Sequence, residues 1–208
     1  MAHCKGIAVL ARLKWVQLHH GDDGSRRFLE ALTPRTREVL ERHVLPHGWV
    51  SIDDFIELNV VADRLFGKGD LELCRVMGTW AAGENLPKLF RLFYRLGSPT
   101  FIFERASKLW GAHYDSGALT LTEPTDHSAR LLLTDFKAPH RAHCLSVLGW
   151  CVGAIELAID HPVEQHFPVG LGFEGDVEAF ILEIALLIGH RQRCHVGELD
   201  ETELDLVL

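Results

Sequence analysis

The segment PHRAHCLSVLGWCVGAIELAID, residues 139–160, decides how this chain folds. Pro139 suits the first turn of a helix, and a long apolar run follows it. Gly149 and Gly153 lie one helical turn apart, so they share a face of the predicted helix. Because glycine costs a helix about 1 kcal/mol at each position, we expect both residues to admit another backbone at close range. The sheet is the neighbour that we expect there.

The residues on either side of this helix predict strands. Alternating leucines around the polar turn 124–128 predict a β-hairpin over residues 119–133. Two further strands are predicted at 163–171 and 176–187, with the glycine-rich turn 172–175 between them. The long helix is therefore expected to lie across a small antiparallel sheet made of two strand pairs.

The N-terminal part is predicted to be helical. Thr33 before Pro34 gives a hydroxyl cap with proline at the first helical position, and Ser51 opens a second helix. Residues 7–18 fit a helix and a strand equally, and Gly21–Gly24 is expected to break that element. The predicted helices cover residues 34–44, 53–66, 70–82, 86–96 and 99–112. This order of elements indicates an α+β protein.

Length and composition limit the possible functions. A chain of 208 residues suits one domain, which we assign to residues 1–196, followed by an acidic tail at 197–208. Apolar residues make up 47% and charged residues 24%, as in ordinary globular proteins. The net charge of −8 repels a nucleic-acid backbone, and no stripe of lysine and arginine reverses it. No apolar run reaches the length of a membrane span, so neither nucleic acid nor a membrane is an expected partner.

The five cysteines favour a reducing compartment. Their number is odd and no pair has CxxC spacing, so we expect buried thiols rather than disulfides. The N-terminal residues lack the apolar core and cleavage site of a signal peptide. Together these features indicate the cytoplasm.

One group of potential metal ligands occurs at the start of the long helix. His140, Cys144 and Cys151 nearly align on one face. His143 lies beside them, and Cys194-His195 could complete a set of four ligands. We favour the alternative, in which the cysteines are core residues and the histidines cap the helix or face solvent. No metal is therefore expected, although the question stays open for these residues.

No motif of a known reaction occurs in the chain. The GxSxG, HExxH and Walker patterns are all missing from the sequence. Gly170-x-Gly172-x-x-Gly175 matches the dinucleotide fingerprint, but too few residues follow it for the βαβ unit that the fingerprint requires. A glycine-rich turn is favoured there. We therefore expect that the protein is not an enzyme.

Several segments along the chain carry a resemblance to known proteins. They are Lys5-Gly6, Gly78, Arg95–Pro99, Trp110–Gly117, and Pro139 followed by Val147–Glu156. Together they resemble an uncharacterised group of paralogous proteins from myxobacteria and related deltaproteobacteria. That group is distantly similar to heme-NO-binding domains, 4-vinyl-reductase-type domains and TRAPP subunits. The resemblance covers nearly all of residues 5–187, and it implies a heme-NO-binding/TRAPP-like fold with a role in small-molecule sensing or protein docking within signalling chains.

The chain departs from the heme branch of this superfamily. The resemblance places the proximal histidine of that branch near Ala106, but no histidine occurs anywhere in residues 48–112. The branch also holds the heme propionates with a Tyr-x-Ser-x-Arg motif, whose matching positions here are Asp135, Lys137 and Pro139. Lys137 alone could contact one carboxylate, and His113 is the nearest imidazole. Because an axial ligand holds heme in place, neither heme nor another cofactor is expected.

The aromatic residues between positions 90 and 114 suit a ligand cavity. Aromatic residues more often build a core, but the resemblance places the ligand cavity of the superfamily in this region. The candidate ligand-binding residues are Phe90, Phe93, Phe101, Trp110, His113 and Leu148. We therefore expect a non-enzymatic sensor module that binds a small apolar ligand in a signalling pathway, without heme. The alternative is a protein-interaction or dimerisation module that has no ligand, and a homodimer or a signalling protein is the expected partner.

Overall fold

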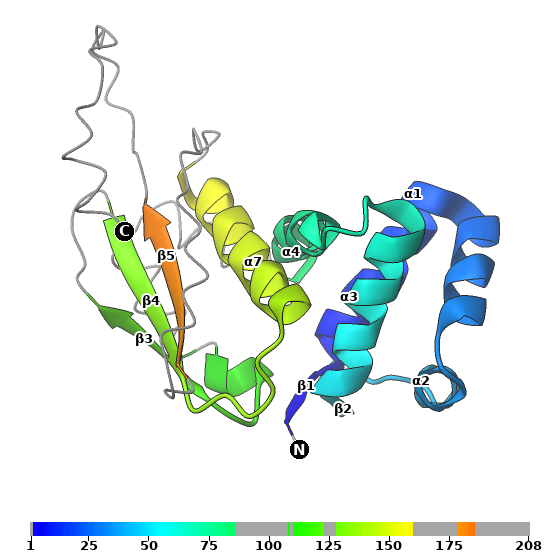
Figure 1. The fold of residues 1–208 in the computed structure, drawn as a ribbon, viewed down its shortest axis with the longest axis horizontal. Helices are drawn as coiled ribbons and strands as arrows, with labels where there is room; N and C mark the ends of the chain where they lie inside the picture. The colour runs from blue at the N-terminus through cyan, green and yellow to red at the C-terminus, as the bar shows by residue number, and fades with distance from the viewer. Residues whose placement is uncertain (1, 86–107, 109, 123–127, 160–178, 186–208) are drawn as a thin grey trace, which may run out of the picture.

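The chain forms a mostly helical α+β fold with two small antiparallel sheets (Figure 1). The computed structural model describes residues 2–85, 108, 110–122, 128–159 and 179–185. Helix α7, Arg141–Ile159, lies between the three-stranded sheet and the helices α3, Ile52–Phe66, and α4, Glu72–Asn85 (Figure 1). The predicted fold class is confirmed. Among the described helices, none combines the length and the apolar composition that crossing a bilayer requires.

Helix α1, Gly6–Ala31, resolves the ambiguity in the N-terminal segment. Residues 7–18 are helical, because Val9 and Val16 bury one face of the helix in the core. The predicted break in Gly21–Gly24 is confirmed at Gly21, whose φ of 64° and ψ of −163° interrupt the helix. A second helical segment follows directly after this kink. Glycine adopts a positive φ without a steric penalty, so a kink is inexpensive at this position.

Two predicted caps open the next two helices. The Thr33 hydroxyl accepts a hydrogen bond from the Thr36 backbone N–H at 3.4 Å, at the start of α2, Pro34–Glu41. The Ser51 hydroxyl accepts from the Asp53 N–H at 3.3 Å, at the start of α3. Both caps satisfy backbone donors that have no partner inside the helix.

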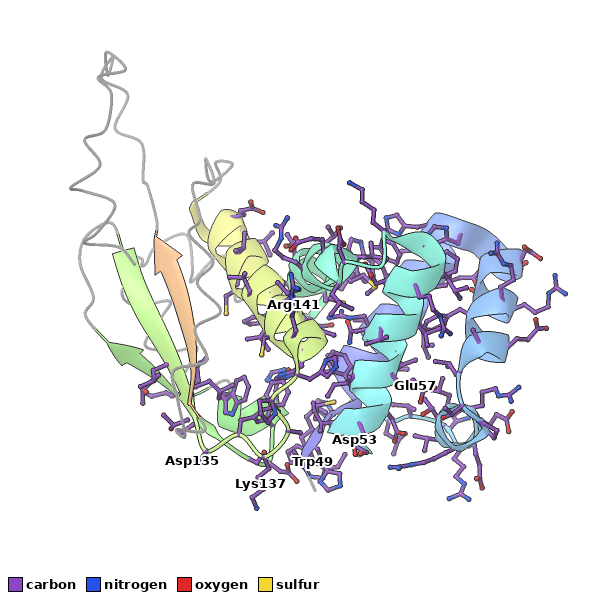
Figure 2. The ribbon with its side chains drawn as sticks, in the orientation of Figure 1. Trp49, Asp53, Glu57, Asp135, Lys137 and Arg141 are labelled. Carbon is purple, nitrogen blue, oxygen red and sulfur yellow. The ribbon has the colours of Figure 1, made fainter. Side chains whose placement is uncertain are left out.

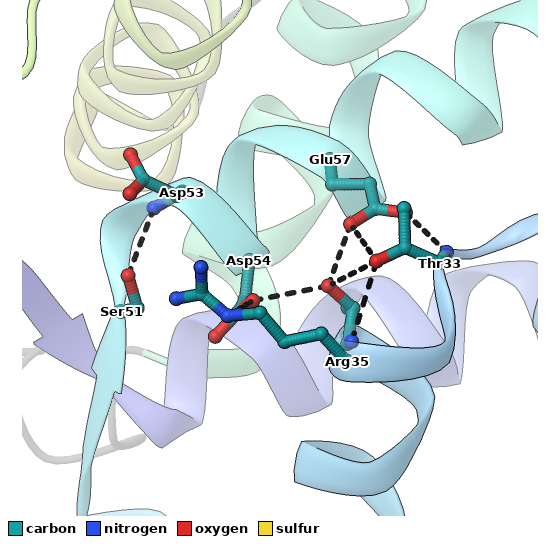
Figure 3. A network of polar contacts seen from close by, with 7 residues as sticks. Thr33, Arg35, Ser51, Asp53, Asp54 and Glu57 are labelled. Carbon is teal, nitrogen blue, oxygen red and sulfur yellow. Dashed lines mark hydrogen bonds and ion pairs between the residues drawn. The ribbon is translucent and has the colours of Figure 1, made fainter.

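A polar network joins α2 to α3 (Figure 3). The Thr33 backbone N–H and hydroxyl donate to the two Glu57 carboxylate oxygens, at 2.5 and 2.9 Å. The Thr36 hydroxyl lies 2.6 Å from Glu57 Oε2 and 3.0 Å from Asp54 Oδ1, and Arg35 pairs with Asp54 at 3.6 Å. Partial burial raises the pKa of Glu57, but the bonds from Thr36 and Thr33 outweigh it, so the pKa is lowered.

The sheets follow the predicted hairpin and add a strand pair that the sequence did not predict. Strands β3, Ala118–Thr122, and β4, Ser128–Thr134, pair antiparallel, which confirms the hairpin. Strand β5, Ala179–Ala185, pairs with β4 inside the predicted 176–187 strand. The strand pair β1, His3–Lys5, and β2, Trp49–Ser51, was not predicted.

Helices α4 and α7 meet at three glycines. A Cβ on Gly149 would lie 2.8 Å from the Arg75 carbonyl carbon, and one on Gly153 would lie 2.5 Å from the Thr79 carbonyl oxygen. A Cβ on Gly78 of α4 would meet the Ser146 carbonyl oxygen of α7. The prediction that these glycines of α7 admit another backbone is confirmed, but the sheet as their neighbour is wrong. The neighbour is α4. Its backbone lies so close to these glycines that a side chain at either position would clash with it.

Some predicted elements lie outside the described residues. These are the helix 86–96, most of the helix 99–112, the strand 163–171, the turn 172–175 and the acidic tail 197–208. Residues 108 and 110–112 of the second helix are helical, as predicted, and His113 extends it by one residue. The single-domain assignment for residues 1–196 stays a prediction.

Candidate functional site

A cavity of about 70 Å³ lies where the N-terminal helices meet α7 and β3. Its walls are mainly apolar and come from segments that are far apart in the sequence. Helices α1, α3 and α4 contribute Ala8, Arg12, Phe55, Ala81 and Asn85; the remaining walls are Trp110, His113, Tyr114, Leu119, Ser146, Val147, Trp150 and Cys151. The cavity therefore lies directly beside the close contact between α4 and α7.

The structure brings two of the predicted ligand residues to this cavity. Trp110 and His113 line it, and the Trp110 indole N–H donates to the Ser116 carbonyl oxygen at 3.0 Å. Leu148 is buried in the core and does not line the cavity. Phe90, Phe93 and Phe101 lie outside the described residues. Ligand binding by any of these residues stays a prediction.

Arg12 is a cavity residue that the sequence analysis missed. Arg12 is only 2% exposed. Each of its three side-chain nitrogens donates a hydrogen bond to an uncharged oxygen. Nε donates to Asn59 Oδ1 at 2.8 Å, Nη1 donates to the Met77 carbonyl oxygen at 3.2 Å, and Nη2 donates to the Ser146 hydroxyl. Its position in the sequence could have indicated its burial, because Arg12 shares a helix face with the buried residues Val9 and Val16.

His143 lies in a cluster of aromatic rings beside the cavity walls. Its ring stacks on Phe136 with centroids 4.7 Å apart, and it meets Tyr114 and Trp110 edge-on at 5.2 and 6.1 Å. Among the described residues, neither ring nitrogen has a hydrogen-bond partner. Burial lowers the pKa of His143 to about 3, with smaller effects from His140 and Arg12, so the ring is neutral at physiological pH.

The possible metal ligands on α7 have separate environments. His140 Nδ1 accepts from the Ala142 backbone N–H at 3.1 Å, so this histidine caps the helix as predicted. The prediction that His143 caps the helix or faces solvent is wrong, because its ring is fully buried among aromatic rings. In the part of the chain that the structure describes, no group of three or more His, Cys, Asp or Glu side chains could hold a metal ion. Cys194-His195 lies outside that part.

The described cysteines are free thiols in the core. They are Cys4, Cys74, Cys144 and Cys151, and burial raises the pKa of each to about 12. For these four residues the prediction of buried thiols is confirmed. Burial also raises the pKa of the Tyr114 phenol. At neutral pH these groups keep their protons, so none of them supplies a nucleophile or a base at the cavity.

The described residues do not fit a heme. Asp135, Lys137 and Pro139 lie in the β4–α7 loop, where all three are exposed, and Figure 2 shows Asp135 and Lys137 at the outer edge of the molecule. A carboxylate and a proline cannot clamp a propionate. The cavity of about 70 Å³ is also small beside the ~300–1,000 Å³ that is usual for cofactor and drug-sized ligands.

Comparison with solved structures identifies the fold. The Fe(II) unliganded H-NOX protein from K. algicida matches with a TM-score of 0.61 at 12% identity, over 91% of this chain and 100% of that protein. The IWP-051-bound H-NOX from Shewanella woodyi matches with a TM-score of 0.53 at 15% identity, over 92% and 99%. An oxygen-binding H-NOX domain related to soluble guanylate cyclases matches with a TM-score of 0.50 at 12% identity, over 91% and 100%.

These matches show that the chain has an H-NOX-like fold, as the heme-NO-binding resemblance implied. At such low identity the likeness concerns the fold alone. No protein-family model matches the chain, and a search of curated proteins finds no match. Membership of the myxobacterial group therefore stays a prediction.

Proposed function

We propose that this protein is a non-enzymatic sensor module that binds a small, mainly apolar ligand without heme, in a signalling pathway of the cytoplasm. The observation that carries the proposal is the cavity between α1, α4 and α7, which combines apolar walls with a few polar groups. Such a combination is typical of ligand sites. Burial raises the pKa of the Cys151 thiol and of the Tyr114 phenol in the cavity wall, so both stay protonated and neutral at neutral pH.

The place of the cavity supports a signalling role. Ala81 on α4 and Val147 on α7 both line it, and the glycine contacts between these helices lie directly alongside. Where two backbones are in direct contact, no flexible side chain lies between them, so a shift of one helix moves the other. A ligand that binds one α4–α7 arrangement better than another would shift the population of the two arrangements, and a protein partner could recognise the difference.

Native mass spectrometry of freshly purified protein tests this proposal. We expect the wild-type protein to carry an additional small-molecule mass. Ala8→Leu should abolish that mass, because the larger side chain fills the cavity from α1. Ala112→Leu is the matched control, because Ala112 is exposed and does not line the cavity, so the mass should persist. A protein without any bound mass, or a mass that survives Ala8→Leu, would contradict the proposal.

One observation favours the alternative, a dimerisation module. A groove of about 470 Å³ is formed by α2 and the two segments of α1 that meet at the Gly21 kink. Leu29 in its wall is 39% exposed. Apolar surface of this kind can bind a second copy of the chain. In the same mass spectra, a dimer without any bound small molecule would support this alternative.

A further inference from the structure

Arg12 introduces a positive charge into the wall of the cavity, and the described part of the chain supplies no negative partner for it. The ion pairs among the described residues do not include Arg12, and no Asp or Glu occurs among the described residues that line the cavity. Burial lowers the pKa of Arg12 to about 10, so the guanidinium is still charged at neutral pH. Its neutral partners satisfy hydrogen bonds but do not balance the charge.

The guanidinium also has donors to spare. An arginine carries five N–H groups, and the three bonds to Asn59, Met77 and Ser146 engage one on each nitrogen. Among the residues that the structure describes, no acceptor engages the second N–H of Nη1 or of Nη2. A guanidinium can present two N–H groups to the two oxygens of one carboxylate. The Ser146 hydroxyl, whose oxygen accepts from Arg12, also lines the cavity and keeps its own proton to donate.

Size and charge limit what can bind here. The cavity of about 70 Å³ holds about five to seven water-sized positions. One guanidinium balances one negative charge, and a second charge among Ala8, Phe55 and Val147 would remain unpaired in an apolar environment. The remaining walls suit a short hydrocarbon chain.

We propose that the ligand of this cavity is a short-chain monocarboxylate, whose carboxylate pairs with the Arg12 guanidinium and whose hydrocarbon chain packs against the apolar walls. This inference rests on the proposed ligand-sensing function and adds the chemical class of the ligand. Arg12 is then the residue that gives the cavity its specificity for an anion.

Calorimetric titration with butyrate and butyramide tests the inference on the wild-type protein. The two molecules have the same size, but only butyrate is charged at neutral pH. We expect saturable butyrate binding, and butyramide should bind about tenfold more weakly or worse, because only the carboxylate carries a negative charge and two acceptor oxygens for the guanidinium. Sodium chloride at the same ionic strength is the control for general salt effects.

Variants of Arg12 assign the effect to this residue. Arg12→Gln should abolish the preference for butyrate over butyramide, and Arg12→Lys should reduce it, because lysine keeps the charge but loses the two-pronged geometry. Circular dichroism checks that each variant is folded; if neither folds, the wild-type comparison still decides. Equal binding of butyrate and butyramide would contradict the proposal that the ligand is a carboxylate, although the cavity would still be a ligand site. Binding of neither would also overturn it, and the Ala8→Leu experiment decides separately on the proposed function.

Discussion

Burial among aromatic rings lowers the pKa of His143 far below that of a free histidine. Four aromatic rings surround the imidazole, and both of its nitrogens lack a hydrogen-bond partner in the described part of the chain. A buried polar atom without a partner costs about 1–3 kcal/mol. The ring is therefore tolerated only in its neutral form, and acid should destabilise the fold through this residue.

We expect His143→Phe to remove part of the acid sensitivity of the protein. The unfolded chain binds a proton at His143 near pH 6.5, whereas the folded chain binds it only near pH 3. The unfolded state therefore holds more protons between these values, and stability falls as the pH falls through this window. From pH 7 to pH 5 this residue should remove about 2 kcal/mol from the free energy of unfolding of the wild type.

Urea unfolding at pH 7 and pH 5 measures the difference. The phenylalanine variant keeps the ring stacking and should show a smaller loss between the two values. His47→Phe replaces an exposed histidine and should retain the full loss of the wild type. An unchanged loss in His143→Phe would show that the imidazole does not resist protonation in the folded protein.

For Arg12, the sequence could predict burial but not the hydrogen-bond partners. Its helical spacing beside Val9 and Val16 could have indicated a buried charge. The partners of this charge could not be predicted, because Asn59, Met77 and Ser146 approach it only in the folded chain. Hydrogen bonds between residues far apart in sequence leave no local pattern.

At the scale of elements, the contact between α4 and α7 organises the fold. Gly149 and Gly153 on α7 and Gly78 on α4 let the two backbones touch. Periodicity correctly predicted that the glycines of α7 form one packing face. It did not predict the neighbour, because a helix pattern says which face is buried and not which element covers it. The strands β1 and β2 were missed because three residues are too few to show alternation.

We expect Gly153→Ala to lower the free energy of unfolding by about 1–3 kcal/mol, the usual cost of overpacking. The new methyl group would lie 2.5 Å from the Thr79 carbonyl oxygen, which the backbone of α4 holds in place. Gly83→Ala is the matched control, because a Cβ there meets nothing within 4 Å. That variant should be unchanged or more stable by up to about 1 kcal/mol, because alanine favours a helix. Equal stability of the two variants in chemical denaturation would rule out the close contact.

At the scale of the whole molecule, an H-NOX-like fold encloses a small, mainly apolar cavity. The α+β class and most of the described elements could be predicted, because caps, prolines and periodicity are local signals. The cavity could be predicted only in part. Trp110 and His113 line it as expected, but Arg12, Ser146 and Trp150 reach it from segments whose meeting depends on the complete fold.

We propose that the cavity binds a small ligand without heme, and a hemin titration tests this most directly. The purified protein is mixed with hemin under reducing conditions, and the Soret region is recorded against a hemin blank. We predict no sharp, stoichiometric Soret band, because the cavity of about 70 Å³ is too small and the exposed positions Asp135, Lys137 and Pro139 provide no propionate clamp. A sharp band at one heme per chain that disappears in His113→Ala would contradict the account.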